Sequence, residues 1–252
     1  MLFLAKPIIP KRPSLFLIFA PMGLGGGEKP GLGYNTSMPT ILETTQLSRY
    51  YGAFRALAET NLSLQEGEIV VLAGPNGAGK STLLLCLSGL LRPTSGRITV
   101  EGFDLYTQEV EAKRRLAFVP DVPRFYNELT AWEHLLFMAQ AYRAGAGFET
   151  RAEKLLKAFD LWAARDLYPQ NYSRGMRLKL GLLLALIRPL RVLLLDEPAS
   201  ALDPEGTALL KSSLLDLRDA GAAILLSSHN PQIAQELNAR QWTMNQGQLE
   251  AA

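Results

Sequence analysis

The sequence lacks the features that mark disulfide-stapled or nucleic-acid-binding proteins. Its one cysteine, Cys86, cannot form an internal disulfide, and its apolar surroundings predict a small buried side chain in a reducing compartment. Basic residues outnumber acidic ones by only 26 to 24, and residues 1–37 contribute +3, so the remainder is close to neutral. Proteins that bind the phosphate backbone of nucleic acids carry an excess of basic residues, which is missing here, so we expect no nucleic-acid partner.

Long hydrophobic runs are missing as well. A membrane-spanning helix needs about 18 or more apolar residues. The run at 178–195 is interrupted by two arginines, a lysine and a proline, and the run at 69–91 contains a polar glycine-rich loop. If the protein acts at a membrane, a separate chain must supply the span. Internal repeats are also absent from the sequence, so the chain carries a single structural unit.

Residues 1–37 differ from the rest of the chain. They are rich in proline, contain a GLGGG tract and have no amphipathic period. The apolar patch at 15–20 is shorter than the roughly 7–15 residues of a signal-peptide core. We therefore interpret 1–37 as a flexible extension, or as an upstream stretch read through to a start at Met38, and 38–252 as the folded domain.

Alternating strand and helix signals predict the fold class. From residue 41 the chain reads as short strand-like runs, with buried-type strands at 69–72, 192–195 and 223–227 and a further strand at 97–100. Helices are predicted over 81–91, stopped by Pro93, over 151–162, and after Thr130 and Glu133, which have capping-box spacing. Alternation on both sides of a helical block at about 122–186 predicts an α/β fold with a parallel core.

The segment GPNGAGKST matches the phosphate-loop pattern and lies between a buried-type strand and a helix. Glycines free the backbone N–H groups to wrap phosphates, and the helix directs its positive end at them. Lys80 is expected to reach the β- and γ-phosphates, Ser81 to hold Mg²⁺ and Thr82 to help bind the α-phosphate. The predicted ATP-binding residues of the loop are Gly74, Pro75, Asn76, Gly77, Ala78, Gly79, Lys80, Ser81 and Thr82.

Carboxylates and a histidine follow two later strands. The run VLLLDEP places Asp196 and Glu197 at a strand end, where Asp196 can hold Mg²⁺ and Glu197 can polarise an attacking water. His229 directly follows the strand at 224–228, where a donor to the γ-phosphate would be useful. The other histidine, His134, is interpreted as a packing or surface residue.

Together these segments resemble the ATP-binding cassette, or ABC, ATPases over about 41–249. The resemblance rests on GPNGAGKST, YSRGM at 172–176, VLLLDEP, SALD at 200–203 and SSH ending at His229. It implies a P-loop NTPase with a mostly parallel central sheet, an N-terminal antiparallel β subdomain and a helical insert. It also implies a dimer of cassettes with two sandwiched ATP molecules: Tyr51 would stack on adenine, Ser173 and Gly175 would bind the γ-phosphate held by the partner, and Asp203 would communicate between the sites.

Two motifs depart from the usual pattern of this family. Arg174 and Met176 stand where the signature usually has glycine and glutamine, and Asp121 stands where a glutamine usually reaches the metal-bound water. Asp121 can still reach that water, so it is a further candidate metal residue. The Ser-x-Gly-Met variant and an acidic residue at this place resemble export-type cassettes.

The leading hypothesis is therefore a Mg²⁺-dependent ATPase subunit of a transporter, with export favoured as the direction. A second cassette and separate membrane-spanning permease subunits would be its partners, the permease docking near 121–128, which would place the chain in the cytoplasm on the inner face of the cell membrane. A soluble ABC ATPase of an assembly process and a cassette that senses ATP without cleaving it are the alternatives. The cargo is not identified by the sequence.

Overall fold

A computed structural model describes residues 38–230 and 232–251. The interpretation of residues 1–37 lies outside this range. In chain order the elements, with short 3₁₀ helices marked η, are β1 (Thr40–Tyr51), β2 (Phe54–Gln65), β3 (Ile69–Ala73), α1 (Lys80–Leu87), β4 (Ser95–Val100), β5 (Phe103–Asp104), α2 (Glu109–Arg115), β6 (Leu116–Val119), α3 (Ala131–Ala141), α4 (Phe148–Ala158), η2 (Trp162–Ala164), η3 (Pro169–Asn171), α5 (Arg174–Leu186), β7 (Val192–Leu195), α6 (Pro204–Asp219), β8 (Ala223–Ser227), α7 (Ile233–Glu236), β9 (Arg240–Asn245) and β10 (Gln248–Ala251).

The central sheet has the strand order β10-β9-β3-β8-β7-β6. Its strands from β9 to β6 run parallel, and β10 is antiparallel to β9. The predicted strands at 69–72, 192–195 and 223–227 are confirmed as β3, β7 and β8. Because the parallel strands share one direction, the residues that follow β3, β6, β7 and β8 meet at one edge of the sheet.

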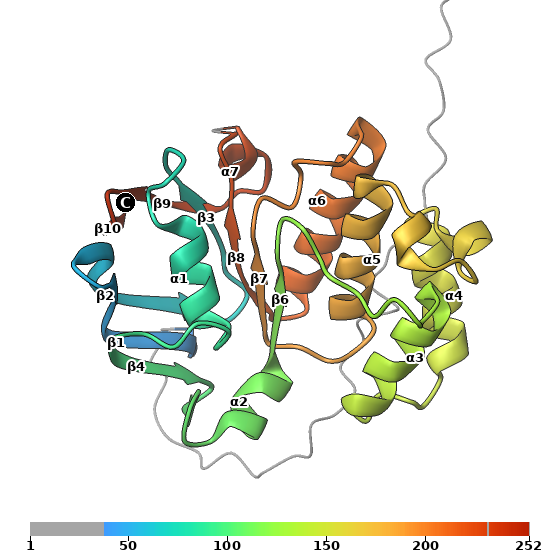
Figure 1. The fold of residues 1–252 in the computed structure, drawn as a ribbon, viewed down its shortest axis with the longest axis horizontal. Coiled ribbons are helices and arrows are strands. Elements are labelled where there is room, and N and C mark those ends of the chain that lie inside the picture. The colour runs from blue at the N-terminus through green and yellow to red at the C-terminus, as the bar shows by residue number, and fades with distance from the viewer. Residues whose placement is uncertain (1–37, 231, 252) are drawn as a thin grey trace, which may run out of the picture.

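Alternate residues of the central strands enter two separate cores. Ile69 and Val71 of β3 pack with helices α3 to α6, whereas Val70 and Leu72 pack with α1 and the antiparallel strands. Figure 1 shows the same division, with α5 and α6 on one side of the central sheet and α1 on the side of β1, β2 and β4. Burial on both faces explains why these strands read as continuous apolar runs.

The second sheet is antiparallel, with the order β2-β1-β4-β5. The predicted strand at 97–100 is confirmed as part of β4. The expectation of short strands from residue 41 was wrong, because β1 and β2 are each 12 residues long. A register shift between Thr44 and Leu47, with Gln46 at φ 50°, breaks the alternation, so one long strand reads as two short runs.

Two predicted helices end earlier than expected. Helix α1 stops at Leu87, because Gly89 takes a φ of 72° and the Leu90 N–H donates to the Leu85 carbonyl. The helix therefore ends at Gly89 and not at Pro93. Helix α4 covers Phe148–Ala158 in place of 151–162, and Asp160 at φ 55° separates it from η2.

Helices α3, α4 and α5 lie between β6 and β7, in the block predicted to be helical. Thr130 and Glu133 form the predicted capping box at the start of α3. His134 is buried, as a packing residue would be, and its ring nitrogens contact the Tyr126 N–H and the Thr130 carbonyl. The limits of this block as a subdomain stay a prediction.

The structure of the described residues bears on two expectations from the sequence, one about Cys86 and one about membrane-spanning helices. Cys86 is fully buried in α1, and burial raises the pKa of its thiol to about 11, so the prediction of a small buried side chain is confirmed. Within residues 38–230 and 232–251, none of the helices has the length and apolar character needed to cross a membrane.

Candidate active site

The phosphate loop connects β3 to α1 and is closely packed against neighbouring backbone. Gly74 has a φ of 153°, and a Cβ there would lie 2.2 Å from the Met244 carbonyl oxygen of β9. Gly79, the N-cap of α1, has a φ of 105°, and its Cβ would lie 2.6 Å from the Ala56 carbonyl oxygen of β2. At both positions the backbone angle and the close approach require glycine.

Lys80 occupies the inside of this loop. Its ammonium group donates to the carbonyl oxygens of Gly74, at 2.7 Å, and Pro75, at 3.2 Å, and lies 4.0 Å from Glu197 Oε1. The side chain is buried, whereas Ser81 beside it is exposed. The loop thus joins a helix N-terminus, a buried ammonium group and an accessible hydroxyl, the combination that suits a polyphosphate.

Asp196 and Glu197 follow β7 and are held by Ser227 at the end of β8. The Ser227 hydroxyl donates to Asp196 Oδ1 at 2.6 Å and accepts the Glu197 N–H at 2.9 Å. Ser227 was not among the site residues predicted from the sequence. The signal was present, because a serine ends an otherwise apolar strand that pairs with the strand ahead of the carboxylates.

His229 and Glu197 are in direct contact. His229 Nδ1 lies 2.9 Å from Glu197 Oε2, and the imidazole is 70% exposed while the glutamate side chain is 20% exposed. Glu197 also has a φ of 47°, a sparsely populated backbone conformation for a residue other than glycine. Strained residues of this kind cluster at active sites. The structure therefore brings together Lys80, Glu197 and His229 from three separate segments.

The residues around Asp196 fit a magnesium ion that arrives with a nucleotide. Mg²⁺ is usually bound through one or two carboxylates together with substrate phosphates. Within the described part of the chain, His, Cys, Asp and Glu side chains form no group of three that could hold a metal on their own. The buried Asp196 and the exposed hydroxyl of Ser81 are the donors available, and their metal role stays a prediction.

Tyr51 ends β1 at the tip of the β1–β2 hairpin. Its ring is 46% exposed, and the Arg49 guanidinium lies 4.5 Å from its centroid. The hairpin reaches the phosphate loop through Ala56, whose carbonyl oxygen lies against Gly79. An exposed ring at the tip of this hairpin suits stacking on a purine, which stays a prediction for Tyr51.

The predicted signature residues begin helix α5. Ser173 is its N-cap and accepts the Met176 N–H at 3.1 Å. A Cβ at Gly175 would lie 2.8 Å from the Ala201 carbonyl oxygen, so the signature packs directly on the loop after β7. In that loop Asp203 caps α6 by accepting a hydrogen bond from the Gly206 N–H at 2.7 Å. This is a structural role, and the role of Asp203 in communication between two ATP sites stays a prediction.

The two departures from the usual family pattern contact each other. Asp121 Oδ1 accepts hydrogen bonds from Arg174, at 2.8 Å, and from the hydroxyl of Ser200, at 2.7 Å. Arg174 also donates to the Ser200 hydroxyl at 3.3 Å. One carboxylate oxygen of Asp121 is therefore engaged with the signature, and its contact with a metal-bound water stays a prediction.

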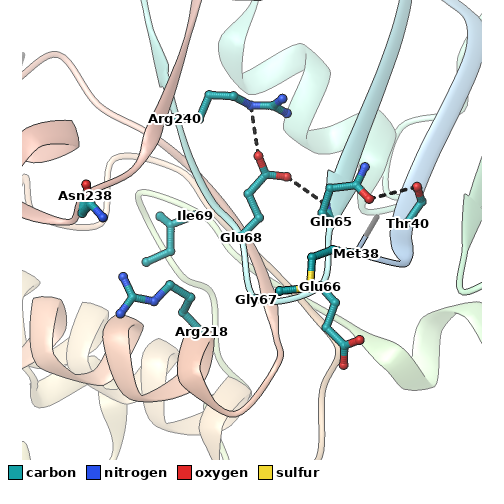
Figure 2. Close-up of a pocket in the computed structure, with 10 residues that line it drawn as sticks. All are labelled: Met38, Thr40, Gln65, Glu66, Gly67, Glu68, Ile69, Arg218, Asn238 and Arg240. Carbon is teal, nitrogen blue, oxygen red and sulfur yellow. Dashed lines mark hydrogen bonds and ion pairs between the residues drawn. The ribbon is translucent and has the colours of Figure 1, made fainter. Parts of the chain in front are cut away.

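A pocket elsewhere in the molecule contains none of the predicted site residues. It lies at the start of β3, the opposite end of that strand from the phosphate loop. Figure 2 shows Glu68 at its centre, paired with Arg240 at 3.0 Å and accepting the Gln65 N–H at 2.8 Å. Glu68 and Arg240 form an ion pair with each other, and none of the predicted site residues lines this pocket. The sheet edge that carries the phosphate loop is therefore the candidate active site.

The fold and the site together define a class. A parallel sheet carries a glycine loop ahead of a helix, with an acidic pair ending a second strand and a histidine after a third, as in P-loop nucleotide-binding proteins. A sequence profile described as ABC transporter matches residues 57–200. The chain therefore belongs to the ABC transporter family as an ATP-binding cassette, and membership of this family implies ATPase activity.

Individual relatives support the same assignment. The chain is 32% identical to the uncharacterized ABC transporter ATP-binding protein YdbJ of Bacillus subtilis, over 84% of this chain and 68% of that protein. It is 31% identical to the SkfA peptide export ATP-binding protein SkfE of the same organism, over 83% of this chain and 87% of SkfE. It is 34% identical to the sulfate/thiosulfate import ATP-binding protein CysA of Synechococcus elongatus, over 83% of this chain, and there it spans only 61% of the relative.

A solved structure confirms the fold. A structure of the ATP-binding subunit of an ABC transporter superimposes with a TM-score of 0.78 at 33% identity, covering 84% of this chain and 90% of the other. The predicted fold class, a P-loop NTPase with a mostly parallel sheet, an antiparallel β unit and a helical insert, is thereby confirmed.

Proposed function

We propose that this chain hydrolyses ATP with Mg²⁺ in a dimer of cassettes and drives export through separate membrane-spanning permease subunits. The proposal rests on the surroundings of Glu197. Its Oε2 contacts His229, and its Oε1 lies 4.0 Å from the Lys80 ammonium group. These contacts join a candidate base, its orienting partner and a phosphate-binding cation at one sheet edge. A cassette that only senses ATP has no need of this arrangement.

Each residue has a distinct part in the proposed reaction. The loop N–H groups and Lys80 bind the phosphates, and Lys80 exchanges its contacts with the Gly74 and Pro75 carbonyl oxygens for phosphate oxygens. Ser81 and Asp196 would hold Mg²⁺, which supplies charge neutralisation when bound. Glu197 accepts a proton from the attacking water.

His229 orients the base and faces the γ-phosphate in this proposal. With Nδ1 donating to Glu197, the ring donates a second hydrogen bond from Nε2 only when both nitrogens carry protons. The imidazolium would then contact the carboxylate and a phosphate oxygen at once. Because the Ser227 hydroxyl accepts the Glu197 N–H, the Glu197 backbone is already held in the position at which its side chain contacts His229.

The position of the signature supports the proposed dimer. Ser173 is exposed at the N-terminus of α5, a 13-residue helix whose positive end favours a phosphate. Ser173 and Gly175 belong to a different segment from the phosphate loop, and the family likeness gives them the partner's ATP. Two copies, or this chain and a second cassette, would complete two sites.

The proposed permease surface lies near the start of the helical block. Val122, Tyr126 and Phe137 are large apolar side chains exposed by 60%, 60% and 48%, and the Tyr126 and Phe137 rings lie 5.9 Å apart. An exposed apolar cluster of this kind suits a protein partner. Export is supported by Asp121 and the Ser-x-Gly-Met signature, and the relatives include both the exporter SkfE and the importer CysA.

The test is phosphate release by the full chain with the membrane protein that co-purifies with it. Purified complex in lipid vesicles should release phosphate only with ATP and Mg²⁺, and Glu197→Gln should abolish release while ATP stays bound. Cargo on the cassette side of the vesicle should stimulate release if the direction is export. Stimulation only from the opposite side would contradict export, and absence of phosphate release from the unmodified complex would contradict the enzyme.

A further inference from the structure

Arg174, Asp121 and Ser200 form a cluster in which three separate loops meet. Asp121 lies two residues after β6, Arg174 begins α5, and Ser200 lies in the loop after β7. The three side chains are mutually hydrogen-bonded, at 2.8 Å from Arg174 to Asp121, 2.7 Å from Ser200 to Asp121 and 3.3 Å from Arg174 to Ser200. The cluster therefore links the proposed docking loop, the signature and the loop that leads to Asp203.

Arg174 and Asp121 each place a charge where the partner's opposite charge offsets an unfavourable interaction. A cation in the first turn of a helix is opposed by the positive end of the helix dipole. The first turn of α5 contains no acidic residue of its own, so Asp121 is the carboxylate that compensates Arg174. Conversely, Asp121 lies at the sheet edge that carries the phosphate loop, where an uncompensated carboxylate would repel a triphosphate.

The pair is too exposed to serve mainly as a fold-stabilising contact. The Arg174 and Asp121 side chains are 56% and 38% exposed, and exposed ion pairs add little to folding stability. The position of the ion pair in the signature indicates its role better than its contribution to stability does. Arg174 lies between Ser173 and Gly175, and the Gly175 backbone is already pressed against the Ala201 carbonyl.

We propose that Arg174 is a positioning residue for the nucleotide-bound dimer, acting through Asp121 and Ser200. It holds Ser173 and Gly175 in the orientation that meets the partner's ATP, and it neutralises Asp121 beside the chain's own ATP. This inference rests on the proposed sandwich of ATP between two cassettes. It makes the two unusual residues a compensating pair: the aspartate at position 121 is compatible with ATP because an arginine stands at position 174.

The test is a double-mutant cycle on ATP-induced dimer formation. The full chain carrying Glu197→Gln is the parent, and dimerisation is followed by sedimentation as ATP is raised at constant Mg²⁺. Arg174→Ala should raise the ATP concentration needed for half-dimerisation by about fivefold when Asp121 is present. The same change should have less than about a twofold effect in Asp121→Asn protein, since no uncompensated carboxylate is left.

Salt and matched variants separate this role from simple packing. The Arg174→Ala effect should shrink as ionic strength rises, because exposed charges are screened. Arg174→Lys should retain most dimerisation, and Lys154→Ala should behave like the parent. Lys154 is an exposed cation of α4 that forms no ion pair with the described residues.

The outcomes distinguish this inference from the proposed function. Three results would overturn the positioning role while leaving the sandwich intact. Arg174→Ala could weaken ATP-induced dimerisation equally with Asp or Asn at position 121, it could leave dimerisation unchanged, or the variant could be unfolded. A parent that binds a fluorescent ATP analogue but forms no dimer would contradict the sandwich, and this inference with it.

Discussion

Glu197 and His229 are joined by a hydrogen bond of 2.9 Å between Oε2 and Nδ1, although they follow different strands. The bond is possible because β7 and β8 are parallel neighbours, with Leu195 in register with Leu226. Ser227 then ties the Glu197 N–H to the end of β8. The candidate base is thus oriented by two groups from the adjacent strand.

Replacing His229 with alanine should lower the catalytic rate while leaving ATP binding nearly unchanged. The change removes the group that orients Glu197 and one proposed contact with the γ-phosphate, but Lys80 and the loop N–H groups, which provide most of the phosphate binding in this proposal, are unchanged. General acid–base contributions are typically about 10²- to 10⁴-fold, and we expect kcat to fall by about 10²-fold with little change in KM. Phosphate release by the permease complex measures this.

Asn230→Ala is the matched control for His229→Ala. Asn230 is the next residue along, is exposed, and its side chain accepts the Gln232 N–H, which lies outside the proposed site. Its removal should leave kcat within about twofold. Equal losses in the two variants would mean that His229 acts only through the local loop structure.

Replacing Ser227 with alanine should affect both stability and catalysis. The hydroxyl is fully buried and serves both Asp196 and the Glu197 N–H, which would be left without this partner. Leaving buried polar groups unsatisfied costs about 1–3 kcal/mol. We expect the free energy of unfolding in urea to fall by that amount, and kcat to fall as well.

Ser213→Ala provides the comparison for Ser227→Ala. Ser213 is equally buried, in α6, but its hydroxyl only donates to the Leu209 carbonyl of its own helix. Its loss should cost about 1 kcal/mol or less and leave kcat unchanged. A normal kcat in Ser227→Ala would contradict the positioning of Glu197 by Ser227.

The phosphate loop and the buried strands could be predicted because their signals are local. A glycine loop between a buried-type strand and a helix is visible within about 20 residues. The Asp121 to Arg174 pair spans 53 positions and joins two loops, and residue periodicity contains no information about which loops meet. In the sequence the two residues are therefore visible only as separate departures from the family pattern.

Element ends were predicted less well for a related reason. The end of α1 depends on the backbone angle of Gly89, and the length of β1 depends on a bulge at Gln46. A single residue in a left-handed conformation decides each case, and residue type alone indicates it weakly. Ser227 was missed because its importance arises from the pairing of β8 with β7 and not from a motif.

Replacing Gly74 with alanine should abolish ATP binding. The new Cβ would lie 2.2 Å from the Met244 carbonyl oxygen at a φ of 153°, so the loop must move away from β9. We expect a stability loss of about 1–3 kcal/mol together with the loss of binding. Titration with a fluorescent ATP analogue and unfolding in urea measure the two effects.

The control for Gly74→Ala is Gly102→Ala. Gly102 also has a positive φ, 81°, but a Cβ there meets no atom within 4 Å. Its replacement should cost about 1 kcal/mol and leave ATP binding intact. If Gly74→Ala still binds ATP normally, the close packing of the loop on β9 is not needed for the site.

Asp104 should make folding stability depend on pH. The Thr107 N–H, together with the Tyr106 N–H and Arg97, holds the pKa of this carboxyl well below its usual value of 3.8. Because the pKa is lower in the folded state, the charged carboxylate stabilises the fold above about pH 4. That contribution is lost as the pH falls below this value.

Asp104→Asn should therefore lower the free energy of unfolding at pH 7 by about 1 kcal/mol, a modest value because the Arg97 side chain is 62% exposed. The difference from the unmodified protein should narrow as the pH falls from about 4 toward 2, where the carboxyl of the unfolded chain is protonated. Urea unfolding at several pH values measures this difference in the free energy of unfolding.

The control is Glu109→Gln, which removes an exposed partner of Lys113 and should have little effect on the free energy of unfolding at any pH. A constant difference between Asp104→Asn and the unmodified protein across this range would show that geometry, and not the charge of Asp104, stabilises the turn at residues 104–107.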